Sequence, residues 1–315
     1  MTADITIIDN VENKLKNPGR INEELLRCFT AFLDIAPKSV ATYQRAIRQL
    51  LSYIVGHGIS NPQPEDFILF KKELEAKGKH PATIQSYLAA ARRFFQWTEQ
   101  MKIYPNITSH VKGVKLDKGF KKDYLTPQQI KAILSSVDRG NIEGLRNYAV
   151  LALMTTGGLR TVEIIRANIE DIRKLSGVSV LYIQGKGHTD KEDFVKLDPN
   201  VEMAIRDYLK ERDNLANDAP LFVSESRRNK GGRLTTRTIS GICKKAMRTA
   251  GYDSERLTAH SLRHTAVTLA LLGGESIEDV QRFARHQNIS TTQIYAHNLD
   301  RMKSHCESTI AAAIF

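Results

Sequence analysis

The stretch "PNITSHVKGVKLDKGFKKDY", residues 105–124, decides how this chain is organised. It lacks the apolar periodicity of a helix or a strand, and it accumulates the lysines Lys112, Lys115, Lys118, Lys121 and Lys122. A basic, aperiodic segment between two patterned regions is typical of a linker, and a length of 315 residues favours two domains over a single core. We therefore predict a short extension over 1–21, a first domain over 22–104, a linker over 105–124 and a second domain over 125–315.

The region before the linker has the pattern of a small helical domain. In "SVATYQRAIRQLLSYIV", residues 39–55, apolar side chains recur at helical spacing. Gly78 ends another such segment and Pro81 opens the next, in the positions that favour helix ends and helix starts. These signals predict four helices, over about 22–34, 39–57, 64–77 and 81–100.

The region after the linker is predicted to be mainly helical with one β-hairpin. Its first helix starts in "TPQQIKAIL", residues 126–134, where Thr126 is the N-cap, Pro127 is the first helical residue and Gln129 completes a capping box. "VSVLYIQGKGHTDKEDFVKL" predicts two short strands, about 178–183 and 193–197. Further helices are predicted over about 199–215, 236–250, 261–272, 277–284, 291–297 and 301–313.

The net charge of +11 favours a polyanionic partner such as nucleic acid, although a surface kept soluble by surplus lysine explains it equally well. No run of eighteen apolar residues is present, and "MTADITIIDNVENK" lacks the basic start and apolar core of a signal peptide. Cys28, Cys243 and Cys306 are isolated, without the paired spacing of a zinc site or a disulfide framework. We expect a cytoplasmic protein with no membrane partner.

Two motifs of the second domain place charged residues beside glycines. In "TTGGLRTVEII", residues 155–165, a glycine pair leads into Arg160, and Glu163 follows one helical turn later. In "QGKGHTDK", residues 184–191, glycines flank Lys186 at the predicted hairpin turn. Taken singly, these are an ordinary surface ion pair and an ordinary solvated lysine.

Two further motifs carry histidines. In "TAHSLRHTAVTLALL", residues 258–272, His260 and Arg263 are three apart and can approach one group together. His264 is placed outside this pair, because it lies about a hundred degrees round the helix from Arg263. In "ARHQNISTTQIYAH", residues 284–297, His286 precedes a helix that Ser290 is predicted to cap, with Gln293 completing the box, and Tyr295 lies one turn inside.

Together these residue types suit chemistry on a phosphodiester. Two arginines can neutralise the non-bridging oxygens without a metal ion, and the sequence offers no carboxylate cluster for magnesium. A tyrosine is a usable nucleophile if cations lower its pKa and a histidine accepts its proton. A lysine can protonate the leaving oxygen. Attack by tyrosine would store the cleaved bond as an ester, so the strand can be resealed without ATP.

The motifs "GGLRTVEI", "GKG", "HSLRH" and "RH…STTQIYAH", in this order, resemble the tyrosine recombinase family, the Xer and phage-type integrases, over roughly residues 22–315. The resemblance implies that Arg160 and Arg263 brace the scissile phosphate and that Tyr295 forms a 3′-phosphotyrosyl link. It further implies that Lys186 is the general acid, His260 assists proton transfer at the tyrosine, His286 hydrogen-bonds the phosphate and Glu163 orients the site. No cofactor is implied.

The resemblance also implies partners and assembly. A SAM-like core-binding domain and the catalytic domain would form a C-shaped clamp on double-stranded DNA. Four protomers, identical or shared with a related recombinase, would join paired recombination sites of a mobile element or chromosome, with or without a directionality factor. The apolar end "IAAAIF", residues 310–315, suits docking in a neighbour or on its own domain. The extension over 1–21 is too short for an arm-binding domain, so we expect binding to core sites only.

Two positions depart from the family pattern, because Arg285 stands where glycine is common and Asn288 stands near a usual serine. Neither departure removes a reacting group, but the loop geometry is expected to differ. Two alternatives remain: a DNA-binding protein of this fold that no longer recombines, which would need neither Tyr295 nor Lys186, and a type IB topoisomerase. Helical basic residues are the candidates for DNA contact, or else ordinary solvated side chains: Arg45, Arg48, Arg92, Arg93, Lys244, Lys245 and Arg248.

Overall fold

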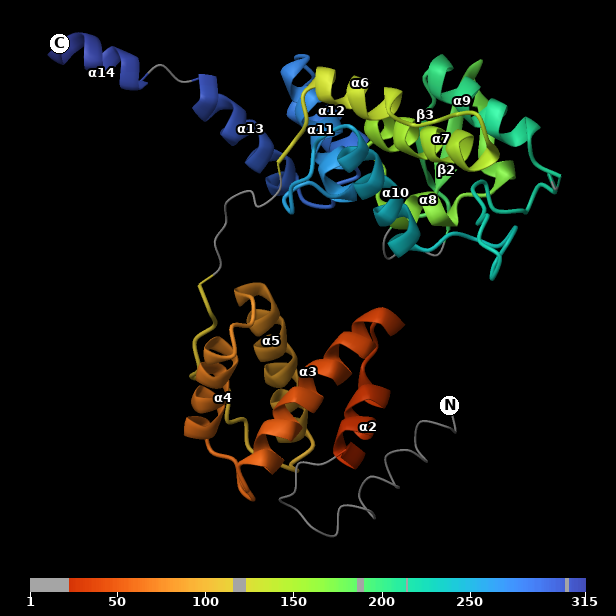
Figure 1. The fold of residues 1–315 in the computed structure, drawn as a ribbon. Helices are drawn as coiled ribbons and strands as arrows, with labels where there is room; N and C mark the ends of the chain where they lie inside the picture. The colour runs from red at the N-terminus through yellow and green to blue at the C-terminus, as the bar shows by residue number, and fades with distance from the viewer. Residues whose placement is uncertain (1–22, 116–122, 186–189, 214, 304–305) are drawn as a thin grey trace. The chain divides into compact units, whose positions relative to one another are not determined.

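The computed structural model of the chain describes residues 23–115, 123–185, 190–213, 215–303 and 306–315. Its contacts divide the chain into two compact units, residues 1–119 and 120–315, each with its own hydrophobic core (Figure 1). Within the described ranges, no helix combines the length and the apolar character needed to cross a membrane.

The described part of the first unit contains the predicted four helices, α2 (Glu23–Phe32), α3 (Pro37–Gly56), α4 (Pro64–Ala76) and α5 (Pro81–Gln100). Three of them open on proline, whose fixed φ and missing N–H suit the first helical position. Aromatic side chains fill the core, where the ring of Phe29 packs edge-on against Phe94 at 5.3 Å between centroids and lies 5.6 Å from Trp97. The helical N-terminal domain is thus confirmed.

The second unit is mainly helical around a small sheet, as predicted (Figure 1). Its helices, apart from one 3₁₀ turn at Ile169–Asp171, are α6 (Pro127–Ser135), α7 (Ile142–Gly157), α8 (Thr161–Arg166), α9 (Pro199–Lys210), α10 (Thr236–Thr249), α11 (Ala259–Leu272), α12 (Ile277–Ala284), α13 (Ile289–Lys303) and α14 (Cys306–Ile314). The central helix α7 packs on α6, α9, α10 and α11. It was not predicted, because its run Ala149–Met154 is buried on every side and shows no amphipathic period.

The sheet has three antiparallel strands in the order β1 (Ile172–Leu175), β2 (Val178–Ile183) and β3 (Asp193–Lys196). The sequence predicted β2 and β3 but missed β1, whose side chains are largely exposed. A two-residue turn joins β1 to β2, and both turn residues have positive φ, 49° at Ser176 and 80° at Gly177. Such a turn matches the twist of a hairpin.

The start of α13 corrects the predicted cap. The helix begins at Ile289, and the side chain of Asn288 accepts a hydrogen bond from the backbone N–H of Ser290 at 2.9 Å. Asn288, which the sequence marked as a departure from the family pattern, therefore occupies the capping position that was assigned to Ser290. The predicted range 291–297 was too short, because α13 continues to Lys303.

Candidate active site

Arg160 and Glu163 form the first part of the site at the corner between α7 and α8. Gly158 caps the C-terminus of α7 with a left-handed φ of 57°, and Arg160 is the N-cap of α8. The Glu163 carboxylate accepts from the Arg160 backbone N–H and from its Nη1, each at 2.8 Å. Glu163 is fully buried, so this pair is a built part of the interior and not a surface contact.

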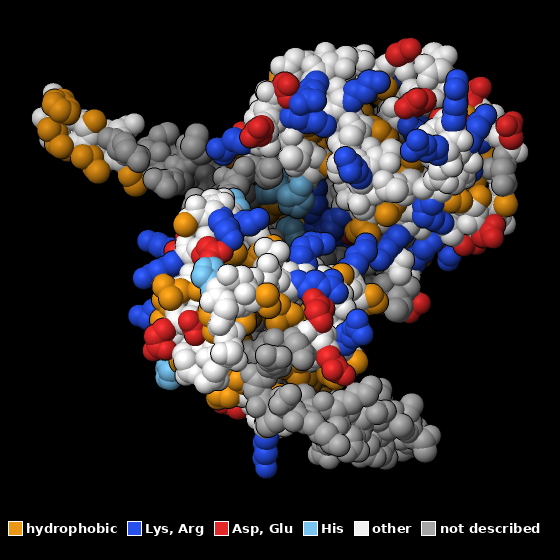
Figure 2. Space-filling model, turned by 60° about the horizontal axis from the view of Figure 1, so that its bottom comes forward, with side chains coloured by type: hydrophobic (Ala, Val, Ile, Leu, Met, Phe, Trp, Pro, Cys, Tyr) orange, Lys and Arg blue, Asp and Glu red, His pale blue; other side chains and the backbone are white. Residues whose placement is uncertain are grey.

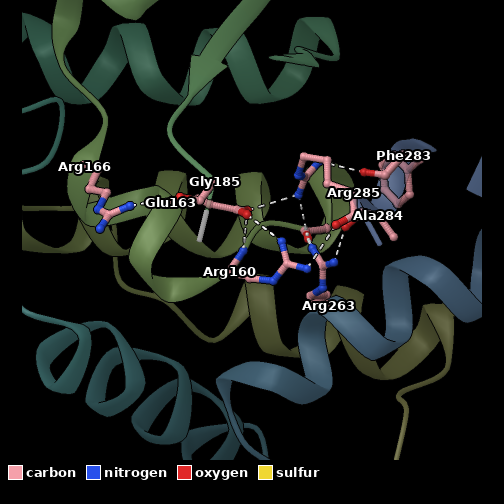
Figure 3. Close-up of polar contacts among 9 residues, drawn as sticks. Arg160, Glu163, Arg166, Gly185, Arg263, Phe283, Ala284 and Arg285 are labelled. Carbon is pink, nitrogen blue, oxygen red and sulfur yellow. Dashed lines mark hydrogen bonds and ion pairs between the residues drawn. The ribbon is translucent and has the colours of Figure 1, made fainter. Parts of the chain in front are cut away.

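Arg263 extends from α11 into the same corner (Figure 3). Its side chain is 1% exposed, and its guanidinium donates to the carbonyl oxygens of Gly158 and Ala284. Burial, reinforced by the charges of Arg160 and Arg285, lowers the pKa of Arg263 to about 9. The guanidinium group remains cationic at neutral pH, although the described hydrogen-bond acceptors that it contacts are uncharged carbonyl oxygens.

Arg285 is a member of this cluster that the sequence did not assign to the site. It follows α12 with a left-handed φ of 54°, and its Nη2 lies 3.1 Å from both Glu163 Oε2 and the Gly158 carbonyl oxygen (Figure 3). Its own carbonyl oxygen accepts from Arg160 Nη2 at 3.2 Å. Burial would raise the pKa of Glu163, but Arg285 and Arg160 outweigh it and hold that pKa below its usual value. We call Arg160, Arg263, Arg285 and Glu163 the arginine cluster.

Tyr295 lies beside the arginine cluster on α13. It is 6% exposed and packs with Val267, Val280 and Ala284. Burial raises the pKa of its phenol to about 12, although the charges of Arg263 and Arg160 act in the opposite direction. The phenol therefore keeps its proton at neutral pH, and its use as a nucleophile requires a base.

Two histidine rings lie against Tyr295. The ring centroid of His286 is 6.1 Å from that of Tyr295, and its Nδ1 lies 2.9 Å from the Thr292 hydroxyl oxygen. The ring centroid of His264 is closer to that of Tyr295, at 4.8 Å, and it also lies 4.8 Å from that of His260. Burial lowers the pKa of both His264 and His286 to about 4, so both rings are neutral at neutral pH.

The sequence analysis placed His264 outside the His260–Arg263 pair, and the structure places its ring against Tyr295. Besides its angle from Arg263, His264 is four residues after His260, so these two histidines share a helical face. His260 itself is exposed on α11. Thr292 is a second site residue that the sequence analysis did not single out, and it is fully buried.

Lys186 lies outside the described residues, and what precedes and follows it is anchored. Arg166, at the end of α8, donates from Nη1 to the Gly185 carbonyl oxygen at 3.0 Å (Figure 3). On the other side of the turn, Lys191 Nζ pairs with Asp171 Oδ2 at 2.5 Å. Among the described residues, no group of three His, Cys, Asp or Glu side chains is placed to hold a metal ion.

The candidate DNA-contacting residues differ in their engagement. Lys and Arg side chains are prominent on the face drawn in Figure 2. Arg92 is partly buried and donates to the Val111 carbonyl oxygen at 2.7 Å, a contact within the first unit. Three others are in ion pairs: Arg48 with Glu23, and Lys244 and Arg248 with Asp253. Arg45, Arg93 and Lys245 are exposed.

Comparison with known families assigns both units. Residues 123–302 match the phage integrase family, and residues 29–102 match the phage integrase N-terminal SAM-like domain. The tyrosine recombinase XerD of Yersinia pestis is 30% identical over 279 residues, covering 87% of this chain and 91% of the relative. XerD of Listeria monocytogenes serotype 4b is 28% identical over 289 residues, covering 87% of this chain and 94% of the relative.

Solved structures agree in fold. The XerH site-specific recombinase in a post-cleavage complex with its difH substrate matches with a TM-score of 0.74 at 22% identity, covering 92% of this chain and 84% of that one. A lambda integrase dimer bound to a core site matches with a TM-score of 0.67 at 14% identity, covering 85% of this chain and 96% of that one. The matches over both units and the order of the motifs lead to one conclusion: the chain belongs to the phage integrase family and is a tyrosine recombinase.

Proposed function

We propose that this protein is a site-specific DNA recombinase that cleaves and rejoins DNA through a 3′-phosphotyrosyl intermediate on Tyr295, without metal or ATP. The observation that carries the proposal is the burial of Tyr295 against His286, within the field of Arg160 and Arg263. A structural tyrosine has no need of that field, whereas a nucleophile attacking an anion does. The XerH relative, whose structure is a post-cleavage complex, supports the same reading.

In the proposed reaction, Arg160 and Arg263 bind the non-bridging oxygens of the scissile phosphate. The 27% exposure of the Arg160 side chain supports this role, because it leaves part of that side chain open to a substrate. The Tyr295 oxygen attacks phosphorus in line as its proton passes to His260, and the bond to the 5′-oxygen breaks. Lys186 supplies the proton that makes this oxygen a free hydroxyl. Attack of a 5′-hydroxyl on the phosphotyrosyl ester reverses each step, so the ester linkage conserves the bond and ATP is unnecessary.

His286 is proposed to hydrogen-bond the phosphate. Its Nδ1 is engaged with the Thr292 hydroxyl, which leaves Nε2 for an oxygen of the substrate. A neutral imidazole can donate that bond only when the proton resides on Nε2, and a Thr hydroxyl donating to Nδ1 fixes this tautomer. Thr292 thereby gains a role in orienting the ring.

The proposed partner is double-stranded DNA with paired recombination sites, bound by four protomers of this chain or by this chain and a related recombinase. The exposed basic residues of both units would contact phosphates and make binding depend on salt. Helix α14 exposes Ile310 (59%) and Ile314 (68%), and the exposed Phe315 follows it, which makes an apolar end suited to docking on a neighbouring protomer. The protein is further proposed to act in the cytoplasm, where it would integrate or excise a mobile element. The proposal also includes a directionality factor as a further partner.

The first test uses nicked suicide duplexes tiled from the DNA that flanks the protein's own gene. Wild type is expected to form an SDS-resistant, protease-sensitive adduct without metal or ATP, and Tyr295→Phe is expected to form none. Tyr252→Phe is the matched control, because Tyr252 packs on the core of the same unit outside the site. Binding without an adduct on any duplex would favour a DNA-binding protein that no longer recombines. Relaxation of supercoiled plasmid lacking a specific site would favour a topoisomerase.

Lys186 is tested by changing the leaving group. Lys186→Ala is expected to slow adduct formation on an ordinary duplex, because the 5′-oxygen leaves poorly without a proton. A duplex with sulfur in place of the bridging 5′-oxygen carries a leaving group that departs as a thiolate. The variant is expected to cleave this duplex as fast as wild type does, and an equal deficit on both duplexes would contradict the general-acid role.

A further inference from the structure

We propose that Arg285 is a positioning residue that neutralises Glu163, so that Arg160 and Arg263 both offer their full charge to the scissile phosphate. This inference rests on the proposed function and deepens it. Arg285 does not need to touch DNA in this role, because it acts through the carboxylate that it shares with Arg160.

The backbone at Arg285 gives the first reason to assign a role to its side chain. The residue directly follows α12 and has a left-handed φ of 54°, where its N–H bonds to the Arg282 carbonyl oxygen and the next N–H bonds to that of Gln281. Glycine adopts this conformation without strain and ends helices in this way most often. Glycine would also present the same carbonyl oxygen to Arg160. The turn therefore does not require an arginine.

The side chain of Arg285 is directed into the protein interior. It is 7% exposed, and its Nη1 donates to the Phe283 carbonyl oxygen at 2.6 Å. Its Nη2 reaches Glu163 Oε2 at 3.1 Å, while the other carboxylate oxygen of Glu163 accepts from Arg160 at 2.8 Å. One carboxylate thus bridges two guanidinium groups in a region from which water is largely excluded.

Arg285 changes the net positive charge that surrounds the proposed phosphate site. Arg160, Arg263 and Glu163 alone carry one surplus positive charge, whereas the complete cluster carries two. A phosphodiester brings one negative charge, and the five-coordinate state formed by an attacking phenolate carries two. Fixed charges that match the developing charge stabilise that state selectively. Burial lowers the pKa of Arg263, and the positive charges of Arg160 and Arg285 lower it further, to about 9.

The test measures the rate of adduct formation on the suicide duplex that wild type cleaves. Arg285→Gly, which relieves the strained φ, is expected to react roughly ten- to a hundredfold more slowly, as expected when charge near a developing anion is lost. Arg285→Lys, which keeps the charge, should retain most of the rate. Arg282→Ala is the control, because Arg282 is an exposed arginine of α12 paired with Asp279. Circular dichroism and thermal melting verify that each variant folds.

The double variant Arg285→Gly with Glu163→Gln distinguishes charge from structure. It restores a surplus of two charges while removing two members of the cluster, so it is expected to recover most of the rate lost by Arg285→Gly. A merely structural role of Arg285 predicts the opposite, a further loss. A double variant slower than Arg285→Gly would overturn the inference.

A second readout varies the charge of the substrate. Replacing one non-bridging oxygen of the scissile phosphate by a methyl group removes one negative charge. Arg285→Gly is expected to lose less rate on this methylphosphonate duplex than on the phosphodiester, and an equal loss would overturn the inference. If wild type forms no adduct on any duplex, the proposed function falls and the inference with it. If wild type reacts and Arg285→Gly matches it, the inference alone falls.

Discussion

His264 provides the sharpest prediction about stability. The ring is 7% exposed and lies against Tyr295, and burial, followed by the charges of His260 and Arg263, lowers its pKa from 6.5 to about 4. Replacing His264 by phenylalanine keeps an aromatic ring against Tyr295 and removes the titrating group. The two proteins should therefore differ most in how their stability responds to acid.

The direction and size of this difference in stability follow from the shifted pKa of His264. The folded pKa lies below the unfolded one, so the contribution of His264 to stability is complete above pH 6.5 and is lost as the pH falls towards 4. At pH 5 the unfolded ring is mostly protonated while the folded ring is mostly neutral, which costs wild type about 2 kcal/mol relative to pH 7. His286 has a similar shift, but both proteins retain it.

Urea unfolding at pH 7 and pH 5 measures this difference. Far-UV circular dichroism follows both units, whereas fluorescence of Trp97, the single tryptophan, follows the N-terminal unit in whose core it is buried. Wild type should lose about 2 kcal/mol more than His264→Phe between the two pH values in the catalytic-unit transition, and the Trp97 transition should be the same in both proteins. Equal acid sensitivity of the catalytic unit would refute the reasoning.

Two further predictions concern the corners that hold the site. Both Gly158 and Gly251 have a left-handed φ, so alanine at either position should cost roughly 1–2 kcal/mol in backbone strain. Gly158→Ala should lose more stability in urea unfolding than Gly251→Ala, because only at Gly158 would the new Cβ lie 3.1 Å from the Phe283 ring. Equal losses would contradict this. Arg166→Ala should slow adduct formation on the suicide duplex while changing the free energy of unfolding by only about 1 kcal/mol, because it frees the Gly185 carbonyl oxygen beside the hairpin turn; an unchanged rate would contradict it.

Local chemistry determined which elements were predictable. The start of α6 was predicted correctly because Thr126 and Gln129 form a reciprocal capping box that depends on no distant residue. Helix α7 was not predicted because tertiary packing buries its run Ala149–Met154 on every side and so erases the period. The β1 strand was missed because its four residues are mostly exposed, although Ser176–Gly177 was a recognisable turn signal.

The site divides along the same line. The chemistry of Arg160, Arg263 and Tyr295 could be inferred from residue types and motif order, and the fold brings these three together. The role of Arg285 could not be inferred, because the direction of a side chain that leaves a left-handed turn depends on the segments packed around it. His264 could have been found from its spacing to His260. The roles of Arg160, Arg263, Tyr295 and Lys186 in the reaction stay predictions.

The ends of two helices stabilise the buried charge of Arg263 in the arginine cluster. Arg263 donates to the carbonyl oxygens of Gly158, just after α7, and of Ala284, the last residue of α12. The carbonyls at a helix C-terminus lack partners within the helix and carry partial negative charge. These carbonyl oxygens stabilise a buried cation but leave its net charge in place, whereas a carboxylate would cancel that charge. Since α11 packs on both α7 and α12, the core packing itself keeps this positive charge at the place where we propose that the phosphate binds.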